Sequence, residues 1–272
     1  MPAPTVNETY RRDLFGERDK QNQCEDLRRA YDRRQGELLS ERQSLLDERK
    51  TLESQNRVEG RWSSESAERC ERLQAIEREV ERRDRELAEL PHRRSAGMDC
   101  IQSASVTQGS EDEIVIRSKL GPPQPRLGFE RPDRCGVERR EGYDVSHSQG
   151  AGTGFECDCG LFQARPEVNR TQQNQGIEAR LRDLYAEKRP DVDLWLTTET
   201  RYKSGTKELA SISYSVDAKA ADGRTAKLWS VTLEADSRGV AKATSVEVGC
   251  SESEVLRSAR QSSITQRHSL GM

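Results

Sequence analysis

The segment LLSERQSLLDERKTLESQ, residues 38–55, places three leucines seven residues apart among mostly charged and polar residues. The same column continues in both directions along residues 10–90, while the column three residues further on is apolar only in part. A seven-residue repeat held in one phase is typical of a long helix that buries a narrow stripe against another helix, as in a coiled coil. The members of the first column are Tyr10, Glu17, Cys24, Tyr31, Leu38, Leu45, Leu52, Glu59, Ser66, Leu73, Val80 and Leu87.

The sequence predicts where this helix begins and ends. Thr5 and Glu8 form a capping box, which predicts a start near Val6. Proline has no backbone N–H for the helical ladder, so Pro91 predicts the end. Residues 6–90 are therefore the expected coiled-coil segment.

Two arrangements of residues 6–90 fit the repeat. The apolar column weakens between residues 55 and 69, and a turn at residues 56–60 would make the segment a helical hairpin. The column resumes in the same phase at Leu73, which favours one continuous helix, on the order of 120 Å long. Such a helix would have to pair with a second copy of the chain or with a partner helix. Cys24 lies in the column and could then form an interchain disulfide.

The chain after Pro91 divides into three further parts. Residues 91–171 are rich in glycine, proline and serine, with one short strand at 113–117, and predict either a linker or an irregular extension pinned by cysteines. Residues 172–250 predict a helix and four strands. Residues 251–272 predict a short helix and a disordered tail.

The part from residue 172 to 250 predicts an α+β domain. Its helix places Ile177, Leu181 and Leu184 on one face and ends before Pro190. The expected strands are 192–202, 209–218, 226–235 and 240–248, with glycine-containing turns between them. In the last strand, Val246 and Val248 are expected to point inward. The predicted fold class is therefore α+β, with a long N-terminal coiled coil followed by a helix and a four-stranded antiparallel meander.

Composition limits the classes of function. Charged residues make up 34% of the chain, and the net charge is −3 with both signs interleaved, so the sequence predicts no nucleic-acid partner. No apolar stretch approaches the length of a membrane span, and the chain opens without a signal-peptide pattern. The seven cysteines show no zinc-ligand spacing, which favours disulfides and an extracytoplasmic (periplasmic or secreted) location. A cytoplasmic scaffold with reduced thiols is the alternative.

Three patterns could carry chemistry. Residues 150–154 read Gly-Ala-Gly-Thr-Gly, similar to a phosphate-binding loop, but an extended segment follows where such a loop needs a helix. Asp191 and Glu199 imitate a metal-dependent nuclease pattern, without the turn that normally separates its two halves. Asp144 and His147 could form an acid–base pair with Cys157 or a serine as nucleophile.

Cys157 and Cys159 form a further short motif. Two cysteines one residue apart point to opposite sides of a strand, so they favour two separate disulfides over a shared metal or redox site, with Cys250 as one partner. The sequence thus assigns no catalytic, cofactor-binding or metal-binding residue and predicts no cofactor.

The resulting hypothesis is a non-catalytic interaction or scaffold protein. The coiled coil would oligomerise the chain or dock a partner helix, and the disulfide-stabilised α+β domain would present a binding surface. The alternative is a secreted effector enzyme, hydrolase-like, that uses His147 and nearby acids, with the coiled coil as a docking stalk. The enzyme would need a concave pocket that converges on His147.

Overall fold

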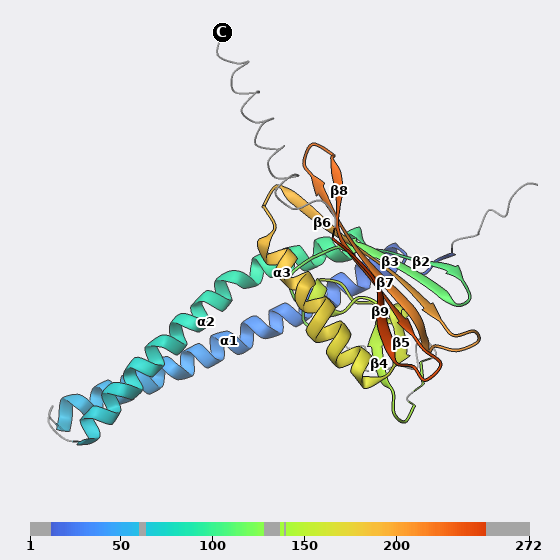
Figure 1. Ribbon diagram of the computed structural model, residues 1–272. Helices are drawn as coiled ribbons and strands as arrows, with labels where there is room; N and C mark the ends of the chain where they lie inside the picture. The colour runs from blue at the N-terminus through green and yellow to red at the C-terminus, as the bar shows by residue number, and fades with distance from the viewer. Residues whose placement is uncertain (1–11, 60–63, 128–136, 139, 249–272) are drawn as a thin grey trace, which may run out of the picture.

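The computed structural model describes residues 12–59, 64–127, 137–138 and 140–248. It has two parts, a long pair of helices and a domain built on an antiparallel sheet, and the helices extend well beyond the sheet domain (Figure 1). The α+β class predicted from the sequence is confirmed. In the described part of the chain, no helix is long and apolar enough to cross a membrane.

The long helical segment is a hairpin, so the preferred prediction of one continuous helix was wrong. Helix α1 (Glu17–Glu59) and helix α2 (Ser64–Ser103) run antiparallel along each other. Leu38 of α1 and Ile76 of α2 are fully buried. Ion pairs join the two helices at Arg42–Asp84, Arg34–Glu86 and Arg72–Glu48, with nitrogen–oxygen distances of 2.6–2.8 Å. Each helix therefore covers the apolar stripe of the other. A seven-residue repeat in constant phase fits this pairing within one chain as well as pairing between two chains.

Both predicted ends of the helical segment also differ. Thr5 and Glu8 lie outside the described residues, and α1 begins only at Glu17, because Arg12–Asp13 form the short strand β1. Pro91 lies inside α2, which continues to Ser103. A proline in a helix costs about 3 kcal/mol, and the burial of Cys100, Ile101 and other later side chains against the domain offsets that cost.

Within the described residues the sheet has seven strands, and the predicted four-stranded sheet was therefore too small. Its order is β1-β2-β3-β6-β7-β8-β9, with every neighbouring pair antiparallel. The four predicted strands correspond to β6 (Val192–Tyr202), β7 (Leu209–Ala220), β8 (Thr225–Ala235) and β9 (Ala241–Val248). Strand β3 (Glu113–Lys119) contains the short strand that was predicted at residues 113–117, whereas β2 (Ser105–Ser110), from the same region, was not predicted. Residues 91–119 are therefore not a linker.

One face of the sheet carries the core. Leu196, Ile212 and Val216 point to this face and are fully buried. It is covered by a continuous helical stretch, wound as a π-helix in η4 (Val168–Glu178) and as an α-helix in α3 (Ala179–Glu187) (Figure 1). Leu181 of α3 belongs to the same core, as predicted. Val246 of β9, predicted to be inward, is 60% exposed because the core thins out at this edge strand.

The chain between β3 and the covering helix contains the two strands of a second, small sheet. Strand β4 (Asp144–His147) pairs with β5 (Leu161–Ala164). The connection between them contains two short 3₁₀ turns, η2 (Ala151–Thr153) and η3 (Asp158–Gly160). This connection holds the Gly-Ala-Gly-Thr-Gly segment, Cys157 and Cys159, and it begins directly after His147.

The described cysteines form no disulfide. Cys24, Cys100 and Cys157 are buried as free thiols, Cys70 is exposed, and Cys159 is half-buried. Cys24 is buried within its own chain, where it accepts a hydrogen bond from the Gln102 side chain, so this arrangement leaves it inaccessible to the interchain disulfide that a paired continuous helix would have allowed. The other two cysteines, including the proposed partner Cys250, lie outside the described residues.

Candidate functional site

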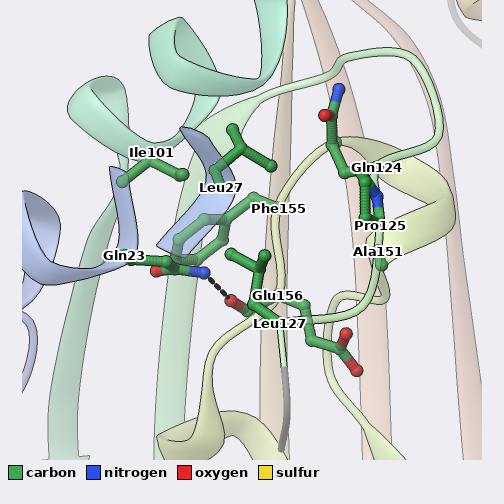
Figure 2. Close-up of a pocket in the computed structure, with 10 residues that line it drawn as sticks. Gln23, Leu27, Ile101, Gln124, Pro125, Leu127, Ala151, Phe155 and Glu156 are labelled. Carbon is green, nitrogen blue, oxygen red and sulfur yellow. Dashed lines mark hydrogen bonds between the residues drawn. The ribbon is translucent and has the colours of Figure 1, made fainter. Parts of the chain in front are cut away.

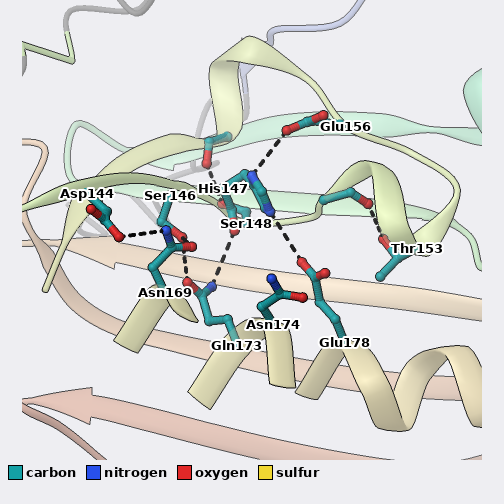
Figure 3. A network of polar contacts seen from close by, with 12 residues as sticks. Asp144, Ser146, His147, Ser148, Thr153, Glu156, Asn169, Gln173, Asn174 and Glu178 are labelled. Atoms are coloured by element: carbon teal, nitrogen blue, oxygen red, sulfur yellow. Dashed lines mark hydrogen bonds and ion pairs between the residues drawn. The ribbon is translucent and has the colours of Figure 1, made fainter. Parts of the chain in front are cut away.

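His147 lies at the centre of a group of charged side chains in the sheet domain. It is the last residue of β4, and both of its ring nitrogens face carboxylates. Nδ1 lies 3.1 Å from Glu156 Oε1, and Nε2 lies 3.2 Å from Glu178 Oε1. The side chains of the three residues are no more than 15% exposed. Figure 3 shows the imidazole held between the two acids, one from the β4–β5 connection and one from the covering helix.

The two carboxylates determine the charge of His147. Burial by itself lowers the pKa of the imidazole, but hydrogen bonds and charge interactions with Glu156 and Glu178 outweigh it and raise the pKa to about 9. His147 is therefore an imidazolium ion at neutral pH. Arg182, one turn after Glu178, lies 3.5 Å from the second carboxylate oxygen of that residue. Two positive and two negative groups thus balance in this cluster.

The Gly-Ala-Gly-Thr-Gly segment packs directly on this cluster. A Cβ atom on Gly150 would overlap the His147 ring and lie 2.6 Å from Glu178 Oε1. A Cβ on Gly152 would lie 3.1 Å from Glu178 Oε2. Gly154 has φ +98° and approaches the backbone of Gly121 so closely that a Cβ would lie 2.7 Å from its Cα. The glycines are therefore required for close packing, and the only helical turn that follows in this connection is three residues long, so a phosphate-binding loop is not formed.

A network of neutral hydrogen bonds continues from His147 toward the sheet (Figure 3). The Gln173 side chain donates to the His147 carbonyl at 3.3 Å and to the Tyr214 hydroxyl at 2.6 Å. The Ser146 hydroxyl in turn donates to Gln173. These contacts satisfy buried polar groups and fix the covering helix against β4 and β7.

The segment that carries Glu156 is also attached to the helical hairpin. The Gln23 side chain of α1 donates a hydrogen bond of 2.5 Å to the Glu156 carbonyl (Figure 2). The rings of Phe15 and Phe155 pack edge to face, with centroids 5.3 Å apart. The cavity between these elements, lined by Leu27, Ile101 and others, has a volume of only about 10 Å³, room for a single water. The base of the hairpin is therefore fastened to the same loop as His147.

The predicted Asp144–His147 pair was wrong. Asp144 binds Arg170, at 2.9 and 3.0 Å, and Asn169, at 3.2 Å. The acids that contact His147 are Glu156 and Glu178, which sequence reasoning did not single out. They lie nine and thirty-one residues away in the chain, and no short-range spacing identifies them. Gly150 was the one sequence feature related to this contact, because the close approach of His147 and Glu178 leaves no room for a Cβ there. Without the fold, a glycine at this position does not show which residues approach it.

The proposed nucleophile is not activated. Cys157 is buried, and desolvation raises the pKa of its thiol well above the ordinary value, which disfavours the reactive thiolate. The hydroxyls beside His147 are engaged as well: Ser148 donates to the Gly160 carbonyl and pairs with Thr200. Both nitrogens of His147 face carboxylates, so neither is free to take a proton from a substrate. The cluster can hold three chain segments together, and its geometry does not favour acid–base catalysis.

The nuclease-like pattern is not assembled either. Asp191 pairs with Arg189 beside it, at 2.8 Å, and Asp193 with Lys119, at 3.0 Å. Glu199 lies far along the extended strand β6 from Asp191. Within the described residues there is no group of three or more histidine, cysteine, aspartate or glutamate side chains that could hold a metal ion.

A different kind of site lies on the helical hairpin. An open groove of about 400 Å³ runs between α1 and α2, lined by Leu45, Ser44 and Ser40 with charged residues on either side. Arg83 crosses it, with Nε 2.5 Å from Glu41. The seam leucine Leu45 is only half-buried there, as are Leu52 and Leu73 further along.

Comparison of the chain with protein-family models, with curated proteins and with solved structures finds no match.

Proposed function

We propose that this protein is a non-catalytic interaction protein whose helical hairpin docks a helix of a partner protein. The observation that carries the proposal is the open groove between α1 and α2, in which the seam leucine Leu45 is only half-buried. Two helices bury a narrow stripe, and a third helix laid along the groove would complete the burial. The sheet domain would serve as the rigid base of the arm.

The form of the arm supports this role. It extends from the sheet domain (Figure 1), and at 1.5 Å per residue a helix of this length measures about 60 Å. Between residues 41 and 56 of α1 no side chain is fully buried, so little of this length is used to stabilise the fold. A long arm with a polar outer surface and an incompletely covered apolar stripe is suited to binding rather than to enclosing a substrate.

The proposal includes two finer features. The helices would pack as an antiparallel coiled coil, with the heptad leucines in the seam. The occupant of the groove would be a helix of a different protein, since the seam that predicted self-pairing is already shared between α1 and α2 of one chain. A second copy of the chain remains an outcome that the test must distinguish.

Photo-crosslinking in cells of the native source tests the groove. A photoreactive amino acid replaces Ser44, which lines the groove, or Lys50, which is exposed on the same helix outside it. We expect a discrete adduct with another protein from position 44 and not from position 50. Equal adducts from both positions, or adducts only with a second copy of the chain, would contradict the proposal.

Two leucine variants provide the matched control. Leu45→Gln changes the groove, whereas Leu39→Gln changes a leucine that is 50% exposed and does not line it. The adduct at position 44 should disappear with Leu45→Gln and persist with Leu39→Gln. Equal loss with both variants would indicate a general effect on the helix instead of docking in the groove.

An extracytoplasmic location is retained as a proposal, based on the number of cysteines. The five described cysteines form no disulfide and do not add to it. Intact mass of the protein from its native source, with and without alkylation, is the test: disulfides or a covalent link to another chain would support the proposal, and seven alkylated thiols would indicate a reducing compartment.

A further inference from the structure

The outer face of the sheet, opposite the covering helix, has a groove of its own. It has a volume of about 330 Å³ and crosses strands β6 to β9. This volume is within the range of small-ligand sites, but the lining is unusual, because such sites are mostly apolar. Here hydroxyl and charged side chains dominate: Thr197, Glu199, Ser213, Ser215, Lys227, Ser230, Thr232, Ser245 and Glu247.

The strand register sets these side chains in two parallel rows. One row, read across the four strands, is Thr197, Ser215, Ser230 and Glu247. The next row, two residues along each strand, is Glu199, Ser213, Thr232 and Ser245. Each row contains three hydroxyls and one carboxylate, and the carboxylates stand at opposite ends. Neighbouring side chains in a row are about 4.8 Å apart, the spacing of strands in a sheet.

The rows are partly fixed in place before any ligand arrives. The hydroxyls of Ser213 and Thr232 lie 2.9 Å apart and bond to each other. Glu247 accepts hydrogen bonds from Ser230, at 3.2 Å, and from Lys227, at 3.3 Å. Glu199 has no hydrogen-bond or ion-pair partner within the described residues, so its carboxylate is available to a ligand.

The chemistry of the lining selects the kind of ligand. Hydroxyls both donate and accept, and a carboxylate accepts from two donors at once, so the rows match a ligand that carries many hydroxyl groups. Two carboxylates and one ammonium group give the groove a net charge of −1, which disfavours phosphate and other anions. The small apolar area of the lining disfavours lipids and aromatic ligands.

We propose that this groove binds a neutral oligosaccharide, whose successive hydroxyl groups bond to the two rows of side chains. The site is separate from the hairpin groove, and it does not depend on docking by the hairpin. It adds a carbohydrate-binding surface to the sheet domain.

Binding of the full-length chain to immobilised glycans, followed by NMR titration, tests the inference. The immobilised set contains neutral, sialylated and sulfated glycans, and the titration uses a neutral hexasaccharide that is bound. We expect saturable binding of neutral glycans and amide shifts that are largest at the two rows. Binding of anionic glycans alone, or of none at millimolar concentration, would overturn the proposal.

Matched variants locate the site. Glu199→Gln and Ser215→Ala alter the rows, whereas Glu234→Gln and Ser211→Ala alter a neighbouring cross-strand pair that does not line the groove. The first two variants should each weaken binding about tenfold, the effect of one lost or weakened hydrogen bond. The two control variants should bind as the unmodified chain does. Equal weakening by both sets would place the ligand elsewhere and overturn the proposal, and thermal unfolding curves confirm that every variant is folded.

Discussion

Nε2 of His147 lies 3.2 Å from Oε1 of Glu178, and this contact joins the end of β4 to the helix that covers the sheet. The other ring nitrogen is bound by Glu156 from the β4–β5 connection, whose carbonyl also contacts α1. The end of β4, the β4–β5 connection and the covering helix therefore meet at one imidazolium ion, and the connection in turn is bound to α1. Its role in this account is structural, and that role can be measured.

Replacement of His147 by alanine should destabilise the protein by about 3 kcal/mol, because two buried carboxylates lose the positive charge between them. Urea unfolding of the full chain, followed by circular dichroism, gives the free energy of unfolding. The control is His92→Ala, at an exposed position of α2, which should change it by less than about 0.5 kcal/mol. Similar values for the two variants would show that the cluster contributes nothing to stability.

The same contact predicts a pH dependence. The pKa of His147 is raised from 6.5 to about 9 in the folded chain, so the folded state holds this proton more tightly than the unfolded state does. Its contribution to stability is full below pH 6.5 and is lost as the pH rises toward 9. The difference in unfolding free energy between the unmodified protein and His147→Gln should therefore shrink over this interval. A difference that stays constant from pH 6 to 9 would be inconsistent with an imidazolium between the two glutamates.

Two glycines should respond in opposite directions to alanine. Gly154→Ala should lower the unfolding free energy by more than about 2 kcal/mol, because φ is +98° and the backbone of Gly121 occupies the space of a Cβ. Gly36→Ala, in α1 with open space around it, should raise the unfolding free energy by about 0.5 to 1 kcal/mol. Thermal and urea unfolding measure both. A Gly154→Ala variant of unchanged stability would refute the close approach of the two segments.

The cysteines should differ strongly in reactivity. Cys70 is exposed on α2, whereas Cys100 and Cys157 are buried, and burial raises the pKa of the Cys100 thiol to about 12. In the native protein, iodoacetamide should modify Cys70 within minutes and leave the other two unmodified until denaturant is added. Peptide mass spectrometry reads each site separately. Rapid labelling of Cys157 under native conditions would mean that the β4–β5 connection is open to solvent.

Strands with regular alternation could be predicted from the sequence alone. In β7, Ile212, Tyr214 and Val216 alternate with serines, and the structure places them on the buried face as expected. Strand β2, in contrast, reads Ser-Val-Thr-Gln-Gly-Ser and contains a single buried apolar residue, Val106. It forms because β3 and β1 pair with it on either side, and this information is not local.

The hairpin could be predicted only in part. The repeat predicted correctly that Leu38, in its apolar column, is a buried position. It did not show that the other helix belongs to the same chain, because the apolar column of α1 continues in the same phase in α2. The pairs that fix the antiparallel arrangement, such as Arg72–Glu48, depend on distances in space.

The candidate sites were the least predictable part. The two hydroxyl rows on the outer sheet face depend on register, and two bulges within β7–β8 and β8–β9 set that register. The serines of β7 were visible in the sequence as one polar face, but their neighbours Ser230, Thr232 and Ser245 become neighbours only when the strands are aligned. The acids around His147 were also missed, because they become its neighbours only when the chain is folded.

In the hairpin the two long helices close on each other within one chain. Crosslinking with a short bifunctional maleimide tests this directly, with cysteines at Arg42 and Asp84, whose side chains pair at 2.6 Å, in a chain that carries Cys70→Ser. Cysteines at Lys50 and Asp84 are the control, because Lys50 lies about 12 Å further along α1.

A mixture of isotope-labelled and unlabelled chains shows whether each crosslink lies within one chain or between two. We predict that the 42–84 crosslink forms within single chains, that the protein stays monomeric, and that the 50–84 control gives little product. Crosslinks that join a labelled chain to an unlabelled one would contradict the hairpin, and with it the proposal that the groove between α1 and α2 is open to a partner helix.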